Sequence, residues 1–329
     1  MILVKFNKST NFKPYFYFAL EEYILNNLLK KNETFFFQWQ IKGIVIGKNQ
    51  IIENEVNLDF VRDNKIEIFR RATGGGCVYN DPQTPLFSII SAQQNKSFNF
   101  KKYLNKIVEA FKNLGIDLYL SGRNDILIND KKISGNAFMK NKNGMVMHGT
   151  LLYDCDIDTM VKCITPDNKK LISKGIKSVS SRVTNLKQFL QEMSQKELTT
   201  YLDNYLTNQQ YILTPEEITQ IDKIAQKYSS QEWIFGEQPQ YDKKLKQKFE
   251  WGNLEILLSL DRGKITNILL KGDFFHKEDN LTEFLNNFIN VLYNKQTLQN
   301  ILKKVNIEDY IVNATNEDFL SLLEQGILY

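Results

Sequence analysis

Apolar and polar positions follow two rhythms along the first half of the chain. Residues 14–30 carry apolar side chains at helical spacing after a proline, which predicts an amphipathic helix. Short apolar runs broken by Gly, Asn and Pro predict strands at 34–40, 43–47, 66–69, 75–79 and 85–90. After a helix at 99–114, residues 125–138 predict a hairpin that turns at Asn129–Asp130, and 144–153 a further strand. Together these elements predict an antiparallel or mixed sheet.

The second half of the chain is predicted to be mainly helical. Helical patterns cover 158–165, 181–190 and 215–231, and the polar stretch 232–252, which contains a proline and several lysines, is interpreted as a linker. A small hairpin at 253–274 and helices near 280–293, 296–304 and 316–325 follow. A segment of about 80 residues can hold its own small core. We therefore predict two domains, 1–245 and 246–329.

Composition excludes several classes of protein. With 42% hydrophobic residues the 329-residue chain can bury a sizeable core, and no apolar run reaches the roughly 18 residues of a membrane span. The opening residues lack the layout of a signal peptide, so we expect a cytoplasmic protein. Three cysteines at unrelated spacings and two histidines predict neither a disulfide framework nor structural zinc. The 42 Lys and Arg are matched by 38 Asp and Glu along the whole chain, which favours a solvated surface over one that binds nucleic acid.

Arginine is scarce, and four of the six arginines (Arg70, Arg71, Arg123 and Arg182) stand in three short glycine-containing stretches, 70–81, 121–138 and 166–186. The planar guanidinium suits phosphate or carboxylate groups. The first stretch, "RRATGGGCVYND" (70–81), matches neither a P-loop nor a dinucleotide-binding glycine fingerprint. Its glycines form either a hairpin turn that needs glycine for its backbone angles, or a bare backbone surface for a ligand beside Arg70 and Arg71.

Two further stretches supply charged and small residues. "SGRNDILINDKKISGNAF" (121–138) contains Asn124 and Asp125, whose oxygens can hold Mg²⁺, and Lys132, which can project a charge into a pocket floored by backbone. "MHGTLL" (147–152) places His148 beside Gly149. A lone histidine is equally compatible with a hydrogen-bonded structural role.

These motifs carry a family resemblance. The stretches just quoted, together with "DCDID", "PDNKKLISKGIKSVSSRVTNL", "WIFGEQPQYD" and the tail "GKITNILLKGDFF", resemble in order and spacing the lipoate–protein ligase A family of the bacterial type with a C-terminal accessory domain. The resemblance covers nearly the whole chain. It implies an α/β (α+β) fold: a catalytic domain with the mixed sheet of biotin and lipoate ligases, similar to class II aminoacyl-tRNA synthetases, and a small α/β accessory domain.

The resemblance also implies an activity and its partners. Family members use ATP and Mg to convert lipoate to lipoyl-AMP and then pass the lipoyl group to one lysine of a lipoyl carrier domain. The acceptor is expected to be a 2-oxoacid dehydrogenase acyltransferase component or the glycine-cleavage H protein, with no nucleic acid or membrane involved. A second hypothesis concerns movement: the polar linker suggests that residues 246–329 reorient after the adenylate forms.

Residue roles carried over from the family fall into four groups. Lys132 is the expected catalytic residue, and Asp125 the expected Mg ligand. ATP or lipoyl-AMP is expected to contact Arg71, Thr73, Gly75, Gly76, Cys77, Val78, Tyr79, Asn124, Asp125 and Lys132. Lipoate is expected to contact Arg71, Lys132, Ser134, Gly135, His148 and Gly149. Lys174 and Arg182 are weaker candidates for phosphate contacts, and Asp273 is expected to be structural.

Two departures from the family pattern keep alternatives open. Asn80-Asp81 stands where relatives commonly have His-Asp, which affects the expected pocket wall, and Cys77 stands where they often have alanine. Related octanoyl- and lipoyl-transferases share this fold but form a thioester on cysteine without ATP, which requires a thiol of lowered pKa. A non-catalytic lipoate- or carrier-binding protein is the third reading, although Lys132 is present. Biotin ligation is disfavoured because the glycine-arginine loop of that family is absent.

Overall fold

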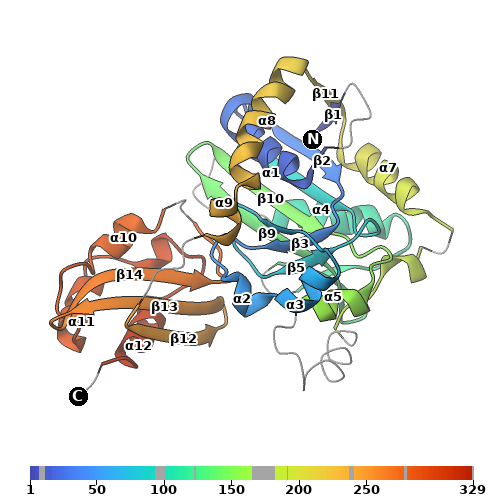
Figure 1. The fold of residues 1–329 in the computed structure, drawn as a ribbon. Helices are drawn as coiled ribbons and strands as arrows, with labels where there is room; N and C mark the ends of the chain where they lie inside the picture. The colour runs from blue at the N-terminus through green and yellow to red at the C-terminus, as the bar shows by residue number, and fades with distance from the viewer. Residues whose placement is uncertain are drawn as a thin grey trace.

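A mixed sheet forms the centre of the larger body in the computed structural model (Figure 1). The structure describes residues 1–6, 12–92, 101–121, 124–164, 182–190, 192–236, 241–277 and 280–327. Within these ranges eight strands pair in the order β11-β1-β2-β6-β10-β9-β8-β7. Their bounds are β1 Ile2–Phe6, β2 Thr34–Trp39, β6 Leu86–Ser91, β7 Tyr119–Ser121, β8 Asp125–Ile128, β9 Lys131–Asn141, β10 Gly144–Thr150 and β11 Gln209–Leu213. Strand β1 is parallel to β2 and β11 and the other pairs are antiparallel, so the expectation of a mixed sheet is confirmed.

A smaller sheet supports the triple glycine. Strand β3 (Gly43–Ile46) pairs in parallel with β4 (Ile68–Arg70) and antiparallel with β5 (Val78–Asn80). The segment between β4 and β5, residues 71–77, is called the glycine loop below. Two strands of one small sheet fix the ends of the loop, and Thr73 of the loop contacts His148 of β10, an interior strand of the large sheet.

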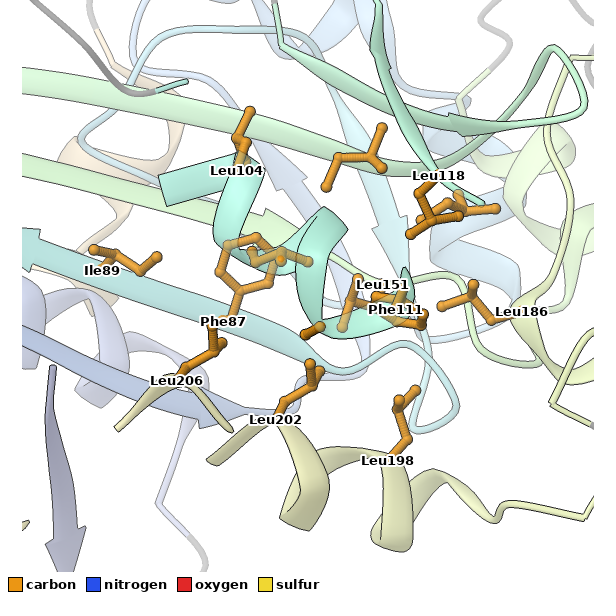
Figure 2. Close-up of a cluster of buried hydrophobic side chains, with 14 of the residues drawn as sticks. Phe87, Ile89, Leu104, Phe111, Leu118, Leu151, Leu186, Leu198, Leu202 and Leu206 are labelled. Atoms are coloured by element: carbon orange, nitrogen blue, oxygen red, sulfur yellow. The ribbon is translucent and has the colours of Figure 1, made fainter. Parts of the chain in front are cut away.

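Helices cover both faces of the large sheet. The helices of the larger body are α1 Pro14–Tyr23, continued by a π-helical turn at Ile24–Leu28, α2 Ile52–Glu55, α3 Leu58–Asp63, α4 Lys101–Lys112, α5 Ile157–Cys163, α7 Gln195–Leu206, α8 Pro215–Ser229 and α9 Gln231–Phe235. Of these, α2, α3 and α5 pack with the small sheet in a separate apolar cluster. Figure 2 shows one face, where leucines of α4 and α7 pack on Phe87 and Ile89 of β6. Helices α1 and α8 pack on the opposite face, against Phe35 and Phe37 of β2. Alternation along each strand explains why neighbouring residues enter different cores.

The accessory domain has a separate core. Its sheet contains β12 Lys243–Phe249, β13 Gly252–Asp261 and β14 Lys264–Gly272, and its helices are α10 Thr282–Asn286, α11 Lys295–Leu302 and α12 Asn316–Glu324. Phe284, Phe288 and Phe319 are fully buried between the sheet and the helices. The predicted boundary at 245/246 lies inside β12, so we propose a division between Gly236 and Tyr241 that leaves this strand whole.

Both predicted hairpin turns are present. Asn129 and Asp130 have φ of 48° and 61°, the two positive values of a type I′ turn, and Arg262 and Gly263 have 47° and 76° between β13 and β14. Three assignments need correction, two helices and the linker. The described part of the helix expected at 181–190, residues 182–190, contains a 3-10 turn at Leu186–Gln188 and no α-helix, and Val183 bridges to Lys132 in the manner of a strand. The supposed linker 232–252 holds α9 and β12, and the helix expected at 280–293 ends at Asn286.

Sequence patterning missed β1, α7 and β11. The pairing of β1 with β11 joins residues separated by more than two hundred positions, so local periodicity does not report it. Helix α7 begins with a capping box in which Ser194 and Glu197 satisfy each other's backbone N–H groups, a signal that was present in the sequence. No helix within the described ranges is long and apolar enough to cross a membrane.

The accessory domain contacts the glycine loop through the segment that follows β14. The Gly272 amide donates to the Asn49 carbonyl at 3.0 Å, and Asn49 Nδ2 lies 2.7 Å from His276 Nε2. The Phe275 ring stacks on Phe138 of β9 with centroids 4.3 Å apart. Asp273 accepts from the backbone and side chain of Asn253 at 2.6 and 2.9 Å, consistent with the structural role expected for it.

Gly74 is expected to be required for this contact. A Cβ on Gly74 would lie 2.1 Å from the Phe274 carbonyl oxygen, whereas a Cβ on Gly76 would meet nothing within 4 Å. Overpacking costs about 1–3 kcal/mol, so Gly74→Ala should speed amide exchange in residues 270–277 by roughly 5- to 150-fold. Hydrogen-exchange mass spectrometry of Gly74→Ala beside the matched control Gly76→Ala measures this. Equal exchange in the two variants would show that the contact does not depend on the missing side chain.

Candidate active site

A narrow cavity lies between the glycine loop and strands β9 and β10. Its volume is about 110 Å³. Ten of the expected site residues line it: Arg71, Gly75, Gly76, Cys77, Val78, Asn124, Lys132, Gly135, His148 and Gly149. Phe18, Trp39, Val45 and Leu86 form an apolar part of the wall. Drug-sized ligands occupy roughly 300 Å³ or more, so in this arrangement the cavity fits only a slender ligand or part of a larger one.

Lys132 is the cation at the mouth of the cavity. Its Nζ lies 2.8 Å from Asp125 Oδ1, and each side chain is about one third exposed. The backbone of Lys132 is fixed on both sides, because its N–H donates to Arg182 and its carbonyl accepts from Thr184. A Cβ on Gly135 would lie 2.8 Å from both Cε and Nζ of Lys132. Glycine at this position therefore allows the lysine side chain to lie along the strand and present its charge to the cavity.

Arg71 is bound mainly to the glycine loop itself. Its Nη2 donates to the carbonyls of Gly74 and Gly76 at 2.8 and 2.7 Å, and its Nε to Thr73 Oγ1 at 3.0 Å. Nη1 donates to the Val45 carbonyl at 3.1 Å. Burial lowers the pKa of the guanidinium to about 10, against smaller opposing effects of Cys77 and Glu21, so it stays charged at neutral pH. Only one Nη1 N–H has no partner among the described residues, so Arg71 shapes the loop and has little left to offer a phosphate.

Arg70 lies outside the cavity and holds three segments together. Its guanidinium donates to the carbonyls of Gly47, Lys48 and Gln50, which follow β3, and to those of Ile234 and Phe235 at the end of α9. Burial lowers the pKa of Arg70 to about 10. The two adjacent arginines therefore have different partners. Arg70 joins the end of α9 to the small sheet, and Arg71 bonds carbonyls of the glycine loop.

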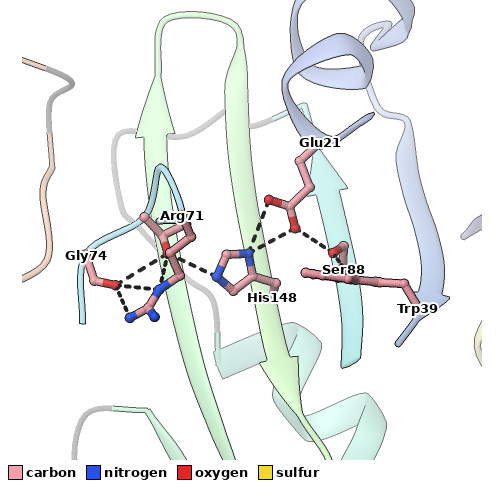
Figure 3. Close-up of polar contacts among 7 residues, drawn as sticks. Glu21, Trp39, Arg71, Gly74, Ser88 and His148 are labelled. Carbon is pink, nitrogen blue, oxygen red and sulfur yellow. Dashed lines mark hydrogen bonds and ion pairs between the residues drawn. The ribbon is translucent and has the colours of Figure 1, made fainter. Parts of the chain in front are cut away.

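His148 belongs to a buried chain of hydrogen bonds (Figure 3). His148 Nδ1 lies 2.9 Å from Glu21 Oε1, and its Nε2 lies 3.0 Å from Thr73 Oγ1. Glu21 Oε1 also accepts from Ser88 Oγ at 2.5 Å, and Ser88 Oγ accepts from the indole N–H of Trp39 at 2.9 Å. His148 therefore lines the cavity and is also part of a buried hydrogen-bond network. The sequence had left open whether it binds a ligand or has a structural role.

Cys77 lines the cavity without the environment of a nucleophile. Burial raises the pKa of its thiol, Glu55 raises it further, and the opposing effect of Arg71 is smaller. Burial likewise raises the pKa values of Cys155 and Cys163 to about 12. A thioester mechanism needs a thiolate, which these surroundings disfavour.

We expect alkylation of the Cys77 thiol to be slow near neutral pH, because burial raises its pKa. The raised pKa means that the thiolate fraction stays small until the pH is well above 9. Alkylation of Cys77 by iodoacetamide, followed by peptide mass spectrometry against Cys77→Ala, should therefore remain slow from pH 7 to pH 9. Rapid alkylation at pH 7 would contradict this reading of the site.

The remaining expected residues lie behind the cavity wall. Thr73 and Ser134 are fully buried, and Tyr79 is 6% exposed in an apolar cluster that raises its pKa to about 12. Asp81 accepts from Gln83, Thr84 and the Asp156 amide. Neither Asn80, the last residue of β5, nor Asp81 lines the cavity, so this departure from the family pattern lies outside the cavity wall. Lys174 lies outside the described residues.

Some cavity residues were not expected from the sequence. In the wall they are Phe18, Trp39, Val45, Leu86, Asn136, Ala137 and Thr150, and Glu21 lies behind the wall. A signal for Glu21 was available, since it lies three residues after Phe18 and four before Leu25 on the apolar side of the first helix. A carboxylate on the buried face of an amphipathic helix points to a specific partner.

Comparisons with known proteins agree on one family. The model of the lipoyl protein ligase A/B catalytic domain matches residues 13–207, and that of the bacterial lipoate protein ligase C-terminus matches 238–323. Lipoate-protein ligase LplJ of Bacillus subtilis is 35% identical over 315 residues, 93% of this chain and 95% of that protein.

Two solved structures extend the comparison. P. falciparum LipL1, solved in complex with lipoate, has a TM-score of 0.79 and 25% identity and covers 99% of this chain and 98% of its own. A bipartite lipoate protein ligase from Thermoplasma acidophilum, studied with its E2 lipoyl domain, has a TM-score of 0.65 and 25% identity, covering 73% of this chain and 97% of its own.

Proposed function

Because this chain belongs to the lipoyl protein ligase A/B family, we propose that it activates lipoate with ATP and then transfers the lipoyl group from lipoyl-AMP to a lysine of a carrier domain. The family resemblance inferred from the sequence is confirmed, and the protein is an enzyme that ligates lipoate to protein. The observation that carries the two-step proposal is the Lys132–Asp125 pair, which faces the glycine loop across a narrow, partly apolar cavity.

The first step is adenylation. An oxygen of the lipoate carboxylate attacks the α-phosphorus of ATP, the bond from that phosphorus to the bridging oxygen breaks, and pyrophosphate leaves. Two anionic groups must meet, so neutralisation of charge and positioning provide most of the catalysis. In this proposal the Lys132 ammonium contacts both the carboxylate and the α-phosphate. The apolar wall formed by Trp39 and Leu86 suits the lipoyl chain.

The site offers Mg²⁺ one carboxylate ligand, Asp125. Within the described ranges no cluster of three or more His, Cys, Asp or Glu residues could hold a metal ion. Mg²⁺ commonly takes one or two carboxylates and completes its shell with phosphate oxygens and water, and Asp125, one third exposed at the cavity mouth, offers one such carboxylate. Asp125 would therefore hold the ion together with ATP, and the bound ion would supply positive charge to the phosphates.

The second step is acyl transfer to the carrier. The neutral ε-amine of the acceptor lysine attacks the carbonyl carbon of the mixed anhydride, the bond from that carbon to the phosphate oxygen breaks, and AMP leaves while the amine loses a proton. Lys132, close to the same carbonyl, stabilises the negative charge that develops on its oxygen. No enzyme cysteine takes part. The carrier domain of a 2-oxoacid dehydrogenase or the glycine-cleavage H protein is the proposed acceptor, and reorientation of the accessory domain between the steps remains part of the proposal.

The test combines the purified chain with lipoate, Mg-ATP and an apo lipoyl carrier domain. The proposal expects AMP and pyrophosphate, lipoylated carrier in the same amount as AMP, and no product when ATP or lipoate is left out. A second reaction supplies an octanoylated carrier as donor and omits ATP. Acyl transfer in that reaction, without AMP in the first, would replace the ligase mechanism with a transferase one.

A further inference from the structure

Glu21 is a buried carboxylate for which the proposed chemistry has no use. It is 4% exposed, on α1, and its carboxylate is surrounded by Ser88 and His148. Among the described residues no lysine or arginine forms an ion pair with it. Burying an ionised carboxylate is costly unless specific hydrogen bonds satisfy it, so these donors must be accounted for.

The direction of each hydrogen bond in this network follows from the indole group of Trp39, where the network begins. The indole N–H of Trp39 can only donate, so Ser88 Oγ accepts it and turns its own proton to Glu21 Oε1. A carboxylate can only accept, and therefore His148 Nδ1 carries a proton that it donates to Glu21. Glu21 thereby determines which nitrogen of the imidazole is protonated.

The other side of the imidazole leads to the glycine loop. Two hydrogen bonds of 3.0 Å each, through Thr73 Oγ1, separate His148 Nε2 from Arg71 Nε. Arg71 Nε can only donate, so the Thr73 hydroxyl accepts its hydrogen bond, and a lone pair on His148 Nε2 lets the hydroxyl donate its own proton to the imidazole. Arg71 in turn fixes the carbonyls of Gly74 and Gly76.

We propose that Glu21 is a positioning residue that sets the conformation of the adenylate-binding glycine loop through the Nδ1-protonated tautomer of His148, the Thr73 hydroxyl and Arg71. The functional part of this inference rests on the proposed adenylation. Without the carboxylate, the imidazole can carry its proton on Nε2 and donate it to Thr73. The Thr73 hydroxyl must then turn to the Gly74 carbonyl, 3.4 Å away, where it competes with Arg71 for the same acceptor.

Nitrogen NMR of the full chain can read the tautomer directly. The chain has only two histidines, so the ¹⁵N signals of two imidazoles appear, and His276→Gln identifies those of His148. At near-neutral pH the parent is expected to show a protonated Nδ1 and an unprotonated Nε2. Glu21→Met, which removes the acceptor at similar length, should shift the proton to Nε2, whereas Glu21→Gln keeps an acceptor oxygen and should retain the parent pattern.

Kinetics of AMP formation provide the second measurement. Glu21→Met is expected to raise the KM for ATP about tenfold, the equivalent of one charged hydrogen bond, and Glu21→Gln to stay within about twofold of the parent. Thr73→Val, which removes the hydroxyl at nearly constant volume, should raise the KM similarly while Nδ1 remains protonated. Glu22→Met is the matched control, because this neighbouring carboxylate points to Lys227 and Tyr228 instead.

The outcomes test separately the proposed function and the hydrogen-bonded series Glu21–His148–Thr73–Arg71, called the relay here. A parent protonated on both nitrogens, a Glu21→Met variant that keeps the parent tautomer, or equal losses in Glu21→Met and Glu21→Gln would each overturn the relay. If Glu21→Met does not fold, Thr73→Val and the parent spectrum still decide. Absence of AMP from the parent would instead contradict the proposed function, and the tautomer measurements would remain valid.

Discussion

Replacing Lys132 with methionine is expected to lower the rate of lipoate-dependent AMP formation by about a hundred- to a thousandfold, the usual effect of removing one group that stabilises developing charge. The physical reason is electrostatic. Lys132 lines the cavity and pairs with Asp125 at 2.8 Å, and the proposed adenylation brings a carboxylate and a triphosphate together beside it. Methionine keeps the length of the side chain and removes only the charge and its donors.

Lys131 provides the matched control for this prediction. It is the preceding residue on β9, its side chain is exposed, and it does not line the cavity, so Lys131→Met should leave AMP formation within about twofold of the parent. Pyrophosphate release with and without lipoate measures the first step in both variants, and transfer from chemically prepared lipoyl-AMP measures the second. Adenylation at the parental rate in Lys132→Met would remove the central element of the mechanism.

Arg70→Met is expected to lower the free energy of unfolding by about 3–5 kcal/mol, because buried carbonyls left without a donor cost about 1–3 kcal/mol each. Arg70 donates to five carbonyls, and those of Gly47 and Gln50 lie in buried surroundings. Methionine fills part of the space but offers none of these bonds. Urea denaturation of the full chain, followed by tryptophan fluorescence and by circular dichroism, measures the change.

Arg62→Met controls for the loss of a positive charge. Arg62 pairs with Asp59 at 2.8 Å, but its side chain is 73% exposed, and such surface pairs contribute about 0–1 kcal/mol. The difference between the two variants therefore reports burial and not net charge. A shift of similar size in both would mean that the carbonyls around Arg70 find other donors, and would assign its role to surface electrostatics.

Local patterning predicted the elements that hold most of the site. Alternation and turn residues located the hairpin from Asp125 to Phe138, and the positive φ values at Asn129 and Asp130 confirm the turn. Motif content placed ten residues that the structure gathers around one cavity. Patterning was less successful for 181–190, because a short segment that pairs with a distant strand through a single bridge has no periodicity of its own.

The division of labour between the two arginines could not be predicted from the sequence. Arg70 and Arg71 are adjacent in "RRATGGG", with the same chemistry and the same local context, but Arg70 is the last residue of β4 and Arg71 is the first of the glycine loop. One reaches the end of α9 and the other the glycine carbonyls, partners separated from each other by more than 150 positions. The Arg71 guanidinium, which the sequence suggested for binding phosphate, makes most of its hydrogen bonds within the protein.

The sequence by itself determined the family, the glycine loop, the cavity lysine and the existence of a second domain, since each is written in a contiguous motif or in local periodicity. Only the tertiary structure decided that burial raises the pKa of the Cys77 thiol, that Arg71 donates to carbonyls of the glycine loop, and that Glu21 contacts His148. The physical reason is common to all three. Burial and hydrogen-bond direction arise from groups brought together by strand pairing and helix packing, and these distances are not encoded in any single stretch of the chain.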